Sequence, residues 1–140
     1  MAVKWRQITG LWLLILSIWG CAKENVLPDL PVNFSAPISD PRLNRLSTGG
    51  GAVAINGYGL AGLIIYRRID GAYMAYDRCS TVNPEQRNPL VIDEPSITAT
   101  DPVSGAKYLL EDGSPAKAPA KFFLKRYQVI LAGNTIHVTN

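Results

Sequence analysis

The chain has 140 residues, with 14 Lys and Arg against 11 Asp and Glu and a formal net charge of +3. Two of the basic residues, Lys4 and Arg6, lie in an N-terminal segment that is predicted to be removed, which leaves 12 basic and 11 acidic residues. A nearly neutral chain of this size fits one compact domain and gives no ground for a nucleic-acid partner.

Residues 1–20 are predicted to form a secretory signal peptide. Lys4 and Arg6 make a basic start, Leu11 to Trp19 is an almost unbroken apolar run, and Gly20 is a small residue before Cys21. The apolar run is too short to span a bilayer, which takes about 20 apolar residues.

The end of this run, Ile18-Trp19-Gly20-Cys21, resembles the lipobox of bacterial lipoproteins, although Trp19 is bulkier than usual at its position. The resemblance implies that Cys21 is acylated and anchors the mature chain in a lipid bilayer. The alternative is cleavage at an ordinary signal site, which would leave Cys21 as a free thiol. Ala22 lacks the aspartate that retains many lipoproteins in the inner membrane, which favours the outer membrane facing the periplasm.

Residues 21–41 are expected to be a lipidated, flexible leader because four prolines exclude a continuous helix. Val32 and Phe34 alternate correctly for an edge strand in its second half. Asp40 is a possible N-cap and Pro41 suits the first helical position, so one or two helical turns are predicted over 41–46. The β domain proper is expected to span residues 42–140.

Turn signals divide the remaining chain into short β-rich runs. Asp70-Gly71 and Gly133-Asn134 predict hairpins, and loops are expected over 80–88 and 114–119. The predicted strands are 52–55, 63–69, 72–77, 90–92, 97–100, 107–110, 122–131 and 135–138. Short strands with little helix predict an all-β antiparallel sandwich or barrel.

The segment Gly57-Tyr-Gly-Leu-Ala-Gly62 has the spacing G-x-G-x-x-G of dinucleotide-binding loops. That function requires a following helix whose N-terminus faces the pyrophosphate. Here the next residues, Leu63 to Arg67, form a predicted strand. The glycines are therefore expected to serve a tight loop between two strands.

Other chemically reactive residues are few. His137 is the only histidine and alternates with apolar neighbours, so it is expected on the sheet surface or in solvent. Cys79 has no intramolecular disulfide partner if Cys21 is acylated; burial is favoured, and pairing between molecules or reactivity are alternatives. The acidic and basic pairs at 93–94, 111–112, 67–68 and 125–126 are expected in solvated turns or on exposed strand faces.

Several segments occur in an order that suggests a family. The strands 62–67 and 73–79 lead to Cys79, and 101–106 forms a second loop. The segments 107–110, 112–115, 118–120, 124–127 and 136–138 follow. This order resembles the Rieske iron–sulfur family, which carries ligand loops C-x-H and C-P-x-H-G-S. The resemblance covers nearly the whole mature chain and implies a Rieske-like antiparallel fold.

The comparison places Cys79 at the first cysteine of the ligand set, but Thr81, Asp101 and Ser104 at the other three positions. A Rieske centre uses two thiolates and two imidazoles. No metal or cofactor is therefore expected; a 2Fe-2S cluster, or another metal held by Cys79 and Asp101, is the alternative.

These observations predict a membrane-anchored, non-enzymatic envelope lipoprotein whose cluster-free domain is a structural or interaction module. The alternatives are a Rieske-type electron-transfer protein and a function that depends on the Cys79 thiol. Its candidate contact surfaces for an unidentified envelope protein are edge strands, the Ser80–Asn88 loop and the Ala118–Pro119 region.

Overall fold

The structure is a computed structural model that describes residues 26–140. The predicted signal peptide and the predicted acylation site Cys21 lie outside the described residues. No helix within 26–140 is long and apolar enough to cross a membrane.

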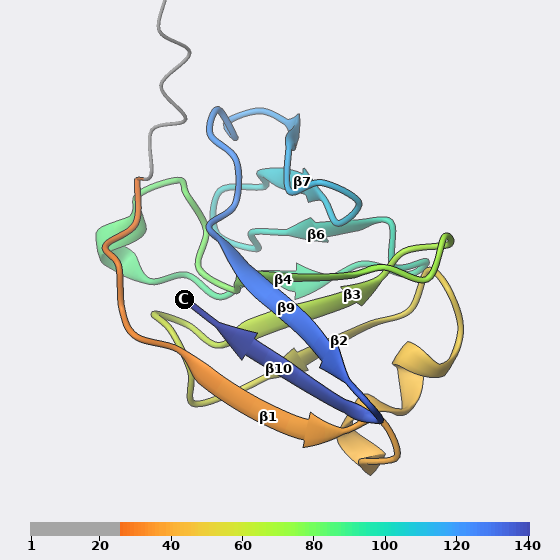
Figure 1. Ribbon diagram of the computed structural model, residues 1–140. Helices are drawn as coiled ribbons and strands as arrows, with labels where there is room; N and C mark the ends of the chain where they lie inside the picture. The colour runs from red at the N-terminus through yellow and green to blue at the C-terminus, as the bar shows by residue number, and fades with distance from the viewer. Residues whose placement is uncertain (1–25) are drawn as a thin grey trace, which may run out of the picture.

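A six-stranded antiparallel sheet forms the larger part of the domain, in the order β1-β10-β9-β4-β3-β2 (Figure 1). Its strands are β1 (Asn33–Pro37), β2 (Ala52–Ile55), β3 (Leu63–Arg67), β4 (Tyr73–Asp77), β9 (Arg126–Ala132) and β10 (Thr135–Thr139). The predicted hairpins are present: Asp70-Gly71 connects β3 with β4, and Gly133-Asn134 connects β9 with β10. Only two residue pairs, Ala75 with Tyr127 and Tyr76 with Arg126, join β4 to β9.

A smaller four-stranded antiparallel sheet, β5-β6-β7-β8, lies against the larger one (Figure 1). It consists of β5 (Val91–Ile92), β6 (Thr98–Thr100), β7 (Lys107–Leu109) and β8 (Pro115–Lys117). Two short 3₁₀ helices, η1 (Pro41–Ser47) and η2 (Pro84–Gln86), complete the fold. The fold is all-β and antiparallel, as the sequence predicts.

The strand β3 separates two hydrophobic cores, because successive side chains point to opposite faces of a strand. Leu63 and Ile65 belong to the core that β1, β10 and η1 close. Ile64 and Tyr66 face the core under the smaller sheet, together with Tyr108. This explains why residues 63–66 are apolar without interruption: both faces of the strand are covered.

The β domain begins before residue 42, inside the segment expected to be a flexible leader. The strand β1 pairs with β10 over five residues, Asn33 to Pro37. Val32, Phe34 and Ala36 are all buried in the first core. The alternation that predicts an edge strand at Val32 and Phe34 therefore marks part of the folded domain, and the predicted helical turns follow it as η1.

Three expectations for the second half of the chain were wrong. Residues 115–117 form the edge strand β8, because Pro115 occupies its first position, where a missing N–H does not interrupt the ladder. The strand predicted over 122–131 begins only at Arg126, since Leu124 donates its N–H to Gly113 O outside any ladder. Lys125 is 6% exposed, and its ammonium group contacts Asp29, so it does not lie on an exposed face.

Candidate functional site

The glycine-rich loop between β2 and β3 encloses the carboxylate of Asp77, which is buried at the end of β4. Leu60 N and Ala61 N donate to its oxygens at 2.8 and 3.3 Å. A Cβ atom on Gly59 would lie 2.3 Å from Asp77 Oδ2, and Gly59 has φ +60°. The G-x-G-x-x-G spacing thus provides room and backbone donors for an anion, and that anion is a side chain of the same protein.

Two further donors complete the environment of Asp77. Cys79 N donates to Oδ1 at 2.9 Å, and the hydroxyl of Tyr127 donates to Oδ2 at 2.8 Å. Burial, followed by the hydrogen bond to Asp77, raises the pKa of Tyr127 above its ordinary value. With four donors the buried charge is compensated, as buried charges must be. Asp77 therefore fixes the start of the loop that contains Cys79.

Cys79 is fully buried and has no disulfide partner among residues 26–140. Its Sγ lies 3.4 Å from Ser80 O and 3.8 Å from Pro84 O, both of which can accept from the thiol. Burial, with the charge of Asp77 as the next cause, raises the pKa of this thiol to about 11. Because the thiolate is the form that attacks electrophiles and binds metals, the environment keeps Cys79 in its unreactive form.

Thr81 is held by Tyr108 of β7. The two hydroxyls are 2.8 Å apart, and Thr81 N also donates to Tyr108 Oη at 3.2 Å. The Thr81 hydroxyl lies 3.3 Å from Phe122 O, which brings a third loop to this place. The Thr81 side chain therefore contacts both β7 and the segment that precedes β9.

Asp101 closes the second loop as an Asx-type turn. Its Oδ1 accepts from Val103 N at 2.9 Å, and its Oδ2 accepts from the Ser104 hydroxyl at 2.6 Å. Ser104 Oγ in turn accepts from Ala106 N at 3.3 Å. Burial raises the pKa of Asp101, but hydrogen bonds from Ser104, Ser80 and the backbone outweigh it, and the net pKa is lowered. The bond from Ser80 connects the two loops.

The positions that the resemblance assigns to cluster ligands thus carry one protonated thiol, one carboxylate and two hydroxyls. A two-iron Rieske centre requires two thiolates and two imidazoles, and hard oxygen donors hold such clusters poorly. The described residues contain no group of three or more His, Cys, Asp or Glu side chains placed to bind a metal. This donor set does not fit an iron–sulfur cluster.

His137 does not join this site. It lies in β10, where it pairs with Ser35 of β1 and Ile130 of β9, so β9 separates its strand from β4. Its side chain is partly exposed, which agrees with the predicted place on the sheet surface.

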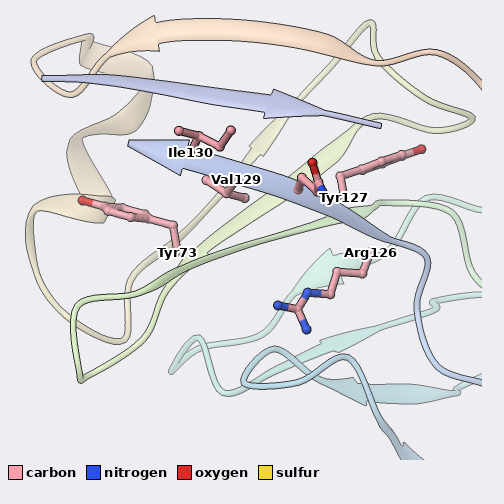
Figure 2. Close-up of a pocket in the computed structure, with 6 residues that line it drawn as sticks. Tyr73, Arg126, Tyr127, Val129 and Ile130 are labelled. Carbon is pink, nitrogen blue, oxygen red and sulfur yellow. The ribbon is translucent and has the colours of Figure 1, made fainter. Parts of the chain in front are cut away.

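A groove opens where β4 and β9 diverge, beyond their two paired residues (Figure 2). It has a volume of about 620 Å³ and is lined by Tyr73, Arg126, Tyr127, Gln128, Val129 and Ile130. The lining contains no cysteine, histidine or carboxylate that could act as a nucleophile or general base. It is a shallow surface feature.

Sequence reasoning identified Cys79, Thr81, Asp101 and Ser104, but it missed Asp77 and Tyr108. The signal for Asp77 was a glycine-rich loop before a strand, whose backbone donors need an anion. Tyr108 carried no signal beyond its place in a predicted strand, because its two partner residues, Ser80 and Thr81, come from a loop 27 to 28 residues away.

Comparison with known proteins supports the fold. No protein-family profile matches the sequence, and no curated protein matches it. The plasma-membrane Rieske protein PetC3 from Synechocystis PCC 6803 superposes with a TM-score of 0.56 and 18% identity, over 79% of this chain and 98% of that one. The ferredoxin of carbazole 1,9a-dioxygenase from Nocardioides aromaticivorans IC177 superposes with a TM-score of 0.51 and 17% identity, over 79% of this chain and 97% of that one. A ferredoxin from Sphingomonas yanoikuyae B1 superposes with a TM-score of 0.50 and 16% identity, over 69% of this chain and 93% of that one. The chain has a Rieske-like fold.

Proposed function

We propose that this protein is a lipid-anchored envelope protein whose Rieske-like domain has no cluster and is a non-enzymatic structural or interaction module. One observation carries the proposal: the side chains at the ligand positions are engaged with one another and with the backbone. Asp101 accepts from Ser104 and Val103, and Thr81 contacts Tyr108. In this arrangement the loops stabilise themselves and require no metal to hold them.

The energetic argument supports the same conclusion. To bind a metal, Asp101 would have to give up its hydrogen bonds, and Cys79 would have to lose a proton that burial retains. Each charge-assisted hydrogen bond of this kind contributes about 1.5–3 kcal/mol. A site with so few soft donors cannot recover that loss, because stable metal sites normally have three or four protein ligands.

The anchoring part of the proposal rests on the sequence before residue 26. A basic start, an apolar run and a small residue before Cys21 match a signal peptide followed by an acylation site. The outer membrane facing the periplasm is the favoured location, because Ala22 follows the cysteine.

Iron content tests the cluster-free domain directly. We expect the purified protein, expressed with iron and sulfide available, to contain far less than one iron atom per chain and to lack broad visible absorption bands. A matched Cys79→Ser variant should give the same iron content as the parent. Two iron atoms per chain, lost in Cys79→Ser, would overturn the proposal and establish the alternative.

That alternative is a Rieske-type electron-transfer protein, and the fold favours it because its structural neighbours are a Rieske protein and ferredoxins. The fold alone does not supply ligands, however, and only Cys79 remains of the soft donors that such a cluster uses.

Acylation is tested separately by the mass of the mature N-terminal peptide. We expect a diacylglyceryl-modified Cys21, and release of the Cys21→Ser variant from the membrane fraction. An unmodified thiol at residue 21 would refute the anchor but leave the iron result intact.

A further inference from the structure

An exposed segment between β8 and β9 combines two aromatic side chains with two lysines. Phe122 and Phe123 are 37% and 48% exposed, and Lys117, Ala118, Pro119 and Lys121 are exposed as well. From residue 113 to residue 140 the chain has four basic residues and no acidic one. Lysine beside aromatic residues is the composition found where proteins rest on the surface of a bilayer.

The chain enters the domain next to this segment. Asp29 contacts the ammonium group of Lys125, two residues after Phe123. Figure 1 shows the start of the described chain and the loop between β8 and β9 at the same side of the domain, whereas the β3–β4 hairpin points to another side. The end of the domain that lies nearest to any N-terminal anchor therefore carries the Lys-Phe segment, residues 117–123.

The length of the intervening chain limits the distance to the membrane. Only seven residues lie between Cys21 and Asp29, so even a fully extended tether, with eight Cα–Cα steps, reaches roughly 28 Å. A domain of this size has a diameter of roughly 35 Å. An anchor at Cys21 thus holds the side of the domain where the chain enters within roughly 28 Å of the bilayer surface, less than the diameter of the domain itself.

We propose that the Lys-Phe segment rests on an anionic bilayer, with Phe122 and Phe123 in the interfacial layer and Lys117 and Lys121 against lipid phosphates. The inference deepens the proposed function and rests on its anchor for the geometry. Each lysine close to an anionic surface adds about 1 kcal/mol of attraction, and the aromatic rings suit the boundary between headgroups and acyl chains.

A single-tryptophan reporter tests the proposal. The three tryptophans of the chain lie at residues 5, 12 and 19, so a chain of residues 22–140 has none and contains every residue that the structure describes. Phe123→Trp reports on the segment. Ile69→Trp is the matched control, because Ile69 is 86% exposed in the β3–β4 hairpin.

We expect vesicles of phosphatidylglycerol and phosphatidylcholine, brominated near the headgroup, to quench Phe123→Trp and shift its emission to the blue. The Ile69→Trp emission should not change. Lys117→Gln with Lys121→Gln should weaken vesicle binding about fivefold per lysine. Arg42→Gln with Arg45→Gln removes the same charge from η1 and should leave binding unchanged.

Equal quenching of both reporters, or none of Phe123→Trp on anionic vesicles, would overturn the inference. Capture of a protein at this segment without vesicle binding would overturn it as well, in favour of a protein contact. The lipid anchor is tested by a separate measurement, flotation of the full chain with the membrane fraction. That result does not depend on Phe123.

Discussion

The hydroxyl of Tyr127 in β9 donates a 2.8 Å hydrogen bond to Asp77 Oδ2 at the end of β4. The two residues are 50 positions apart, and between them they connect the glycine-rich loop, the Cys79 loop and the longest strand. Four donors converge on this carboxylate. Asp77 is 1% exposed, so all four donors are groups of the protein itself and its role is internal.

Tyr127→Phe should lower the free energy of unfolding by about 1.5–3 kcal/mol, because it removes a hydrogen bond to a buried charge. Urea unfolding measures the change. Tyr58→Phe is the control: Tyr58 packs edge-on against Phe34, and we expect a change below about 0.5 kcal/mol. Equal effects of the two variants would show that the Asp77 hydrogen bond does not stabilise the fold.

Gly59→Ala should destabilise the domain more than Gly57→Ala. Both glycines have positive φ, +60° and +90°, so both variants strain the backbone by about 1 kcal/mol. Only at Gly59 would the new Cβ meet Asp77 Oδ2, at 2.3 Å, whereas nothing lies within 4 Å at Gly57. We expect a further loss of about 1–3 kcal/mol for Gly59→Ala, as for other overpacked sites. Thermal unfolding of the two variants measures the difference. Equal losses of stability for Gly59→Ala and Gly57→Ala would contradict the prediction.

The buried thiol of Cys79 should make stability depend on pH in the alkaline range. Its pKa is raised from 9.0 to about 11 in the folded chain, so the folded state holds the proton more tightly than the unfolded state. The resulting contribution to the free energy of unfolding is fully present below pH 9 and is lost as the pH rises through 11. It amounts to about 2 kcal/mol between pH 8 and pH 11.

Cys79→Ala removes this contribution and should show a correspondingly shallower loss of stability between these two pH values. Tyr76 and Tyr127 also have raised pKa values, but they are unchanged in the variant and cancel in the comparison. At pH 8 the native thiol should resist iodoacetamide until the chain is unfolded. Rapid alkylation of the native protein would contradict a buried, protonated Cys79 and favour a thiol-dependent function.

A chain that begins at residue 42 should fail to fold, whereas one that begins at residue 26 should fold. The first loses β1 and with it three core residues, Val32, Phe34 and Ala36. Phe34→Ala in the longer chain should cost about 3–5 kcal/mol, and Ser35→Ala, exposed on the same strand, should cost less than about 0.5 kcal/mol. Circular dichroism and solubility provide the readout. A folded 42–140 chain would show that β1 is dispensable.

The sequence alone determined the fold class, both hairpins, the helical turns after Asp40 and the order of segments that indicated the Rieske-like fold. These features depend on local rules: turn residues set hairpins, prolines set boundaries, and alternation sets strands. The absence of a second thiolate and of any histidine in the two loops was equally visible, because it is a matter of residue identity.

Only the tertiary structure decided what the remaining side chains do. It showed that β3 is covered on both faces, that β1 belongs to the domain, and that Lys125 is buried beside Asp29. It also showed that the glycine-rich loop binds Asp77 and that Tyr108 holds Thr81. The physical reason is common to all of them: each depends on contacts between residues far apart in the chain, and neither local propensity nor hydrophobic periodicity records which distant segments will meet.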